Sequence, residues 1–217
     1  MGINLSRMNW REFFNKRKIE FILTLVFLII ILIVYSNFLE YVENRNGVSL
    51  PDPILNLFNP VDLTWLIFGL IYTSIVIAIL DLTKEPNLLL LAIQCYSLLV
   101  IIRLIVMYIT PLNAPAKLIL LSDPFVQFFG SGKVLTRDLF FSGHTATLFL
   151  LFLIVKKRIL KLFFLCSTLI IGTCVILQHV HYTVDVLTAP FFSYSAYRIV
   201  IIINKFIPVS STVHRKD

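Results

Sequence analysis

Six long apolar runs, rich in Leu, Ile, Val and Phe, divide the chain, and short polar segments separate them. About 20 helical residues cross the roughly 30 Å hydrocarbon core of a bilayer, so runs of this length predict membrane-spanning helices. None of the runs alternates apolar and polar residues as the strands of a membrane barrel do. We therefore predict an all-α integral membrane protein, a bundle of six transmembrane helices at about residues 21–39, 63–80, 88–109, 139–155, 162–180 and 183–203.

The composition agrees with this prediction. Of the 217 residues, 58% are hydrophobic and only 14% are charged, whereas a soluble domain carries roughly 25% charged residues. The first apolar run is too long for a signal peptide, and no small-residue cleavage site follows it. We predict an amphipathic N-terminal segment at 1–20, a six-helix membrane domain at 21–203 and a basic tail at 204–217.

Lys and Arg are unevenly divided between the two sides of the predicted bundle. Thirteen lie on the side that holds both termini, and four lie on the other side. Because cytoplasmic segments are enriched in Lys and Arg, both termini are expected in the cytoplasm. The net charge of +7 is then mainly a topology signal and an attraction for lipid head groups, and no nucleic-acid partner is expected.

The N-terminal segment mixes Trp10, Phe13 and Phe14 with basic residues. This mixture predicts a helix that lies on the cytoplasmic head-group surface before the first span. The first residues, MGINLS, also fit the myristoylation pattern at Gly2, although so short a pattern is readily matched by chance. The three cysteines all fall within predicted spans, so we interpret them as small apolar core residues.

Ionisable side chains gather at the opposite, outer membrane face. His144 begins the fourth span, His181 follows the fifth, Asp185 enters the sixth, and Arg103 lies about two turns below the outer end of the third. An ionisable residue near the centre of a span costs roughly 2.5–3.5 kcal/mol on insertion scales. A lone histidine is often a satisfied core residue, but convergence of two histidines and an aspartate on one face indicates function.

The spacing of these residues suggests their chemistry. His181 and Asp185 are four positions apart, so a carboxylate could hold one imidazole nitrogen and leave the lone pair of the other free to attack. His144 follows Ser142 and Gly143 at a helix start, where backbone N–H groups suit a phosphate, and it could protonate a leaving oxygen. The set suggests phosphoryl transfer through a phosphohistidine, without cofactor or metal. Metal ligation by the two histidines and the aspartate is the competing interpretation.

Two motifs carry a family resemblance. FSGHTA at 141–146 and HYTVD at 181–185 resemble the catalytic motifs of the sphingomyelin synthase family, which lies within the phosphatidic acid phosphatase type 2 superfamily and has a six-helix membrane core. RLIVMYIT at 103–110 and SLPDP at 49–53 resemble further motifs of that family, and Asp138 matches the Asp of its CGD-x-x-FSGH pattern. The resemblance covers about residues 49–200.

The chain also departs from these patterns. Arg137 stands where the family has the Cys of CGD. Cys174 and Val175 stand where the phosphatases of the superfamily carry a Ser-Arg pair before their second histidine. The absence of that pair favours the synthase branch and leaves phosphate binding to other groups.

The resemblance implies roles for individual residues. His181 is expected to be the nucleophile, Asp185 its orienting partner, and His144 the group that protonates the departing diacylglycerol oxygen and then deprotonates the acceptor. Substrate binding is expected from Arg103, Asp138, Ser142, Gly143 and Tyr182. Of these, Arg103 would hold the phosphate, and Tyr182 would stack on a quaternary ammonium or lie in the interfacial belt. His179 is expected to have a structural or head-group-rim role.

Three functions compete at this point. The first is a lipid head-group transferase, with a glycerophospholipid donor and ceramide or a similar lipid alcohol as acceptor. The second is a lipid phosphatase that uses the same site with water as acceptor. The third is a membrane scaffold or transporter without catalysis. The sequence leaves the head group and the oligomeric state open. The short chain favours a bacterial inner membrane with a periplasmic site, and a eukaryotic secretory membrane with a lumenal site is the alternative.

Overall fold

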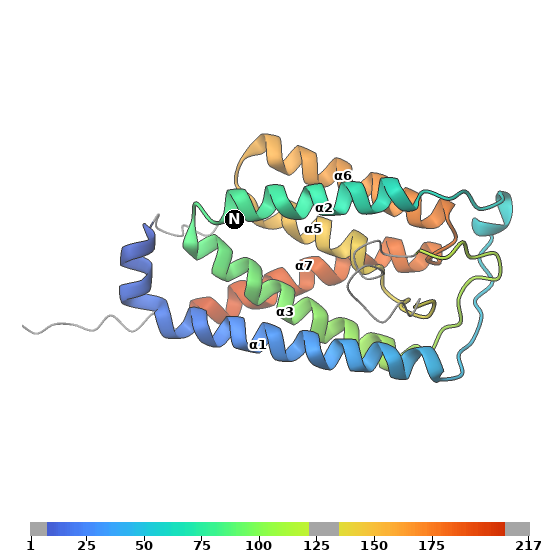
Figure 1. The fold of residues 1–217 in the computed structure, drawn as a ribbon, viewed down its shortest axis with the longest axis horizontal. Coiled ribbons are helices and arrows are strands. Elements are labelled where there is room, and N and C mark those ends of the chain that lie inside the picture. The colour runs from blue at the N-terminus through green and yellow to red at the C-terminus, as the bar shows by residue number, and fades with distance from the viewer. Residues whose placement is uncertain (1–7, 122–134, 207–217) are drawn as a thin grey trace, which may run out of the picture.

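The computed structural model describes residues 8–121 and 135–206. Within these residues the chain forms six α-helices and no strand, and the helices run alternately up and down a bundle (Figure 1). The fold class predicted from the sequence is therefore confirmed. The helices are α1 (Trp10–Asn44), α2 (Thr64–Leu82), α3 (Pro86–Ile109), α5 (Gly143–Ile154), α6 (Arg158–Leu177) and α7 (Thr183–Phe206), with one 3₁₀ turn, η1 (Leu55–Leu57).

Five of these helices are long and apolar enough to cross a membrane, and α5 is the exception. The prediction of a fourth spanning helix over 139–155 was wrong in extent, because α5 has only 12 residues and rises about 18 Å. The backbone N–H of Ser142 donates to Asp185 O at 3.1 Å, outside α5. The residues just before Gly143 are thus held in a loop against α7 and do not extend the helix.

Helix α1 is longer than predicted and is bent. Asn9 caps its start by accepting a hydrogen bond from Glu12 N at 2.9 Å, and non-helical backbone angles at Arg17 mark a kink. The segment before the kink turns away from the long part of α1 (Figure 1). It packs on its own chain, since Trp10 Nε1 donates to Thr83 O at 2.8 Å and Phe13 is fully buried. Its location on a membrane surface stays a prediction.

Two predicted features fall outside the described residues. The MGINLS pattern at Gly2 lies within residues 1–7, and most of the predicted basic tail lies within 207–217.

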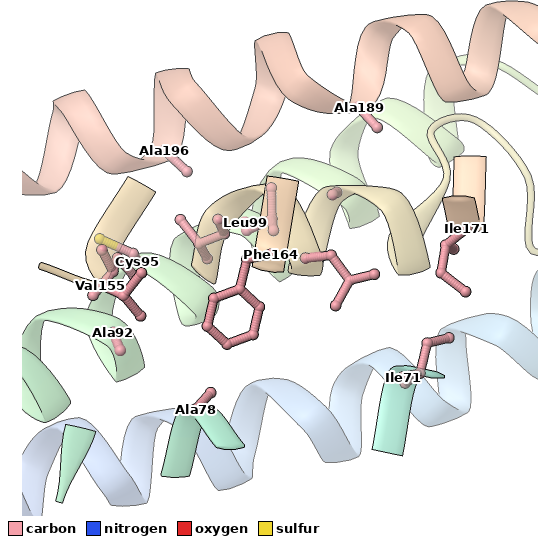
Figure 2. Packing of buried hydrophobic residues seen from close by; sticks show 14 of the residues in the cluster. Ile71, Ala78, Ala92, Cys95, Leu99, Val155, Phe164, Ile171, Ala189 and Ala196 are labelled. Atoms are coloured by element: carbon pink, nitrogen blue, oxygen red, sulfur yellow. The ribbon is translucent and has the colours of Figure 1, made fainter. Parts of the chain in front are cut away.

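The short helix α5 lies at the centre of the bundle, between α6, α7, α3 and α2. Fully buried small residues of α7, Ala189, Ser193 and Ala196, let it approach α5 closely. Ser193 Oγ donates to Ala146 O of α5 at 2.8 Å. Figure 2 shows the two alanines pointing into the apolar cluster around Phe164. This close packing fixes α5 and α7, the helices that carry the two motifs.

The two ends of the bundle differ in their connections. At the end that we call the basic end, which holds the start of α1 and the end of α7, Lys156 pairs with Glu85 at 2.6 Å and Lys157 pairs with Asp81. The turn between α5 and α6 is thereby joined to the last turn of α2 and to the turn that follows it. The opposite end, the site end, holds the starts of α5 and α7.

Loops at the site end are hydrogen-bonded to each other. Val48 N donates to Pro111 O at 2.9 Å, and Asn113 N donates to Val48 O at 3.0 Å. A Cβ on Gly47 would lie 2.6 Å from the carbonyl carbon of Leu112, so only glycine fits this approach. The segment containing SLPDP is thus fixed against the end of α3.

Candidate active site

The HYTVD motif forms a buried histidine–carboxylate pair at the start of α7. His181 Nδ1 lies 3.2 Å from Asp185 Oδ2, and the two residues are 2% and 0% exposed. His181 precedes the helix, so the contact arises because Asp185, in the first turn, reaches back to it. The same carboxylate oxygen accepts from Tyr182 N at 3.1 Å, as in a capping box. Nδ1 is therefore engaged, and Nε2 is the nitrogen left for chemistry.

The FSGH motif meets this pair through the backbone. Ser142 N donates to Asp185 O at 3.1 Å, and the fully buried Ser142 side chain lies 3.1 Å from Thr145 Oγ1. His144 is the second residue of α5, is half-buried, and meets the ring of Phe68 edge-on at 6.2 Å between centroids. The two motifs, separated by more than 30 residues in the chain, thus share one location.

Arg103 of α3 lies directly on the start of α5. A Cβ built on Gly143 would be 1.6 Å from Arg103 Nη1, so any side chain at position 143 would displace the guanidinium. The first N–H groups of a helix have no partner within the helix, and they favour anions. A guanidinium and a helix N-terminus side by side are two of the groups that bind phosphate in proteins.

The guanidinium is held in place by two other residues. Arg103 Nη2 donates to Asp138 Oδ1 at 2.8 Å, and Tyr35 of α1 donates to the same oxygen at 3.0 Å. Arg103 Cζ also lies 5.8 Å from the centre of the Tyr35 ring. The structure thus gives Asp138 a contact with Arg103, which makes it a positioning residue for the predicted phosphate-binding group.

Two buried polar atoms at this location have no hydrogen-bond partner among the described residues: Arg103 Nε and Asp185 Oδ1. Leaving such an atom unpaired costs about 1–3 kcal/mol, more for a charged group. Most buried polar atoms of folded proteins are paired, so exceptions mark a bound water, a ligand or a functional site.

Helix α1 also fixes the loop that leads into FSGH. Glu43 accepts hydrogen bonds from Thr136 N at 2.8 Å, from Thr136 Oγ1 at 2.6 Å and from Arg137 N at 3.0 Å. Sequence reasoning missed Glu43 and Tyr35, because their partners lie about 100 residues away and no local pattern signals such contacts.

Asp52 of the SLPDP segment supports the start of α7. Its carboxylate accepts from Thr183 N at 2.7 Å and from Thr183 Oγ1 at 3.1 Å. Burial raises the pKa of this carboxyl, but the hydrogen bonds from Thr183, Leu55 and Ile54 outweigh that effect and hold its pKa below the ordinary value of 3.8. Asp52 therefore fixes the helix that begins two residues after His181.

His179 has a structural position in the turn between α6 and α7. Val180 N donates to Val175 O, and His179 N donates to Ile176 O, both at 2.9 Å. These bonds form the Schellman pattern that ends many helices, in which the left-handed residue is usually glycine. Here His179 stands at this left-handed position, with a φ of 57°. Burial and Lys117 lower its pKa below the usual value, although Asp52 opposes the shift.

Tyr182 is 2% exposed, and its hydroxyl is engaged on both sides. It donates to Asn113 O at 3.0 Å and accepts from Leu50 N at 3.3 Å. The side chain therefore joins the two site-end loops to the turn that holds His181. Stacking on a quaternary ammonium, expected from the sequence, stays a prediction.

The competing interpretation of the site is metal ligation by the two histidines and the aspartate. Within residues 8–121 and 135–206, no group of three or more His, Cys, Asp or Glu side chains has an arrangement that could hold a metal ion.

Comparison with known families covers the part of the chain that carries both motifs. Residues 137–202 match the family model PAP2 superfamily C-terminal. The match supports assignment to the PAP2 superfamily, the phosphatidic acid phosphatase type 2 superfamily, and it supports phosphoester hydrolysis or transfer on lipids. It does not separate the phosphatases of the superfamily from its transferases. A search of curated proteins found no match to the chain.

Proposed function

We propose that this protein is a lipid head-group phosphotransferase similar to the sphingomyelin synthases. It moves a phosphorylated head group from a glycerophospholipid to ceramide or a similar lipid alcohol. The observation that carries the proposal is the meeting of the two motifs, in which the buried His181–Asp185 pair is bonded to the FSGH loop and Arg103 lies on Gly143.

The first step transfers the head group to the enzyme. The lone pair of His181 Nε2 attacks phosphorus, and the bond between phosphorus and the diacylglycerol oxygen breaks. Protonated His144 gives its proton to the departing oxygen. Asp185 holds Nδ1–H and stabilises the positive charge that develops on the ring. Arg103 and the N-terminal amides of α5 bind the non-bridging phosphate oxygens.

The second step reverses these roles. His144, now neutral, takes the proton of the acceptor hydroxyl. The acceptor oxygen attacks phosphorus, and the bond between phosphorus and Nε2 breaks with its electron pair returning to His181. Diacylglycerol and the new phospholipid are the products, and the enzyme regains its starting protonation.

Two observations support transfer over hydrolysis. His181 and Asp185 are buried, and exclusion of water protects a reactive phosphoenzyme from hydrolysis. Cys174 and Val175 replace the Ser-Arg pair typical of the superfamily's phosphatases. A lipid phosphatase with water as acceptor is the alternative, and it shares the first step.

The membrane location follows from the same proposal. With the basic end in the cytoplasm, the site end faces the opposite surface, which is the periplasm for a bacterial inner membrane or the lumen for a eukaryotic secretory membrane.

The test is head-group transfer by purified protein in mixed liposomes. Phosphatidylcholine, phosphatidylethanolamine and phosphatidylinositol serve as donors, and ceramide serves as acceptor. We expect a ceramide phospholipid from one donor, absent with His181→Asn and retained with His179→Asn. The second variant is a matched control, because Asn tolerates the left-handed conformation at position 179. Diacylglycerol release without a ceramide product, also lost with His181→Asn, would establish a lipid hydrolase, with water as acceptor, instead.

A further inference from the structure

A large groove begins at the basic end of the bundle and runs along α1, α3 and α7 as far as Ile101 of α3, two residues before Arg103. Its volume is about 790 Å³, within the range of roughly 300–1,000 Å³ typical of ligand pockets. Helix α1 packs on α3, and α3 packs on α7, so α3 forms the floor of the groove and the other two helices form its walls. Most of its lining is apolar, including Leu23, Phe27, Leu91, Leu98 and Val200.

The mouth of the groove is polar and joins all three helices. Arg17 Nη1 donates to Asn87 Oδ1 at 2.9 Å, and its Nε and Nη2 donate to Glu20. Gln94 Nε2 donates to Glu20 Oε1 at 3.2 Å, and Asn204 Nδ2 donates to Gln94 Oε1 at 2.8 Å. An apolar groove that ends in a hydrogen-bonding mouth matches a phospholipid, with its acyl chain inside and its head group at the mouth.

Charge selects the class of phospholipid. Arg17 and Lys205 line the groove together with one acid, Glu20, so the lining carries a net positive charge. Arg17 donates through Nε, Nη1 and Nη2 to Glu20 and Asn87, and a guanidinium has five N–H groups in all. Lys205 is exposed. Basic pockets between membrane helices bind anionic head groups, and each nearby Lys or Arg contributes about 1 kcal/mol.

We infer that this groove binds an anionic phospholipid of the leaflet at the basic end. The inference is independent of the catalytic proposal, since the groove shares no residue with the candidate active site. Within a membrane, the medium that fills an apolar groove open to its surroundings is lipid. The bound lipid contacts α1 and α7 together and so holds α1 against the bundle.

Binding of a lipid in the groove is also expected to affect the site end, because α1 runs from one end of the bundle to the other. Tyr35 and Glu43 of this helix hold Asp138 and the residues just before it. A lipid that fixes the start of α1 therefore also stabilises the loop that precedes FSGH.

The test compares phosphatidylglycerol with phosphatidylcholine binding to the delipidated full-length protein by native mass spectrometry. We expect tighter binding of phosphatidylglycerol, and a loss of about fivefold in its affinity with Lys205→Gln, the effect of one surface charge. Lys84→Gln is the matched control, because Lys84 is exposed at the same end and does not line the groove. Equal binding of both lipids, or an equal loss with Lys84→Gln, would overturn the charge selection.

A second pair of variants tests the groove itself. Leu23→Trp places a large ring in the groove and is expected to weaken binding of both lipids, whereas Ile33→Trp, on the same helix but outside the groove, is expected to leave binding unchanged. Both positions are exposed, by 62% and 58%, so neither change repacks the core. Unchanged binding with Leu23→Trp in a protein of normal thermal stability would show that the lipid lies elsewhere.

Discussion

The motif residues at the site end and the ion pairs at the basic end of this bundle differ in how deeply they are buried. At the site end, His181 and Asp185 are buried as a pair, and the half-buried Asp52 binds Thr183 across 131 residues. At the basic end, the exposed Lys156 and Lys157 pair with acids at the end of α2 and just after it. We expect the first arrangement to fix the geometry of the site, and the second to set the orientation in the membrane and to attract lipid.

This difference has an energetic counterpart. Hydrogen bonds to charged groups contribute about 1.5–3 kcal/mol, and breaking one in a buried location leaves the other partner unpaired. Exposed ion pairs contribute about 0–1 kcal/mol. Substitutions at the site end are therefore expected to cost much more than substitutions at the basic end.

The largest effect is expected for Asp185→Asn. The amide keeps the shape of the side chain but no longer stabilises positive charge on His181 or selects its tautomer. In other enzymes loss of this partner lowers kcat by about 10⁴-fold, and we expect a loss on the order of 10³–10⁴-fold in head-group transfer. The measurement is the initial rate in liposomes, with thermal unfolding as the check on folding. A folded variant with more than a tenth of normal activity would contradict the assigned role.

Gly143→Ala is expected to have the next largest effect on activity. The new Cβ meets Arg103 Nη1, so the guanidinium must move from the start of α5. Misplacement by about 1 Å can cost 10²-fold in rate, and we expect a loss of that order in kcat/KM.

Gly69→Ala is the control for that change. Nothing lies within 4 Å of a Cβ at Gly69 in α2, so this variant should keep its activity and gain about 0.5–1 kcal/mol in helix stability. Similar losses of activity in both variants would show that the contact with Arg103 is unimportant.

Asp52→Ala tests the support of α7 and should have a moderate effect on stability. Removal of a helix cap costs about 0.5–2 kcal/mol. Because the pKa of Asp52 is lowered in the folded protein, its contribution is complete at neutral pH and is lost as the pH falls below the ordinary value of 3.8. The difference in unfolding temperature between the unsubstituted protein and Asp52→Ala should therefore become smaller at acidic pH. A difference that is unchanged at low pH would rule out the carboxylate as its source.

The smallest effect is expected at the basic end. Lys157→Gln removes the ion pair between the exposed Lys157 ammonium and the Asp81 carboxylate. Because glutamine can still donate a hydrogen bond to that carboxylate, the free energy of unfolding should change by no more than about 1 kcal/mol. Head-group transfer should stay within twofold of normal. A loss of activity comparable with that of Gly143→Ala would contradict the predicted difference between the two ends of the bundle.

Much of the fold followed from local patterns. Apolar run length is a property of neighbouring residues, so the six helices were predicted from it. The start of α5 was not, because a backbone bond to Asp185 ends the preceding loop at Ser142, and such a tertiary contact leaves no mark on hydropathy. The kink at Arg17 was missed for the same reason, since its side chain bonds to α3.

In the candidate site, too, local sequence patterns predicted some features, and tertiary contacts determined the others. The distribution of Lys and Arg predicted the topology, and that topology places His144, His181, Asp185 and Arg103 at one membrane face. The four-residue spacing predicted the pairing of His181 with Asp185. The residues that hold the loop before FSGH could not be predicted from the sequence. Tyr35 and Glu43 lie in a helix whose sequence is otherwise typical of a membrane span. Asp52 belongs to the SLPDP segment, which carries part of the family resemblance, but its contact with Thr183 depends on a fold that brings the first loop to the last helix.

The central claim is that His181 carries the head group between donor and acceptor, and its most direct test is the location of the covalent adduct. The protein is mixed with donor phospholipid in the absence of acceptor, quenched without acid, digested and analysed by mass spectrometry. The account predicts a phospho-head-group adduct on His181 that disappears when ceramide is added. An adduct on His144, or transfer that proceeds without any adduct on His181, would contradict it.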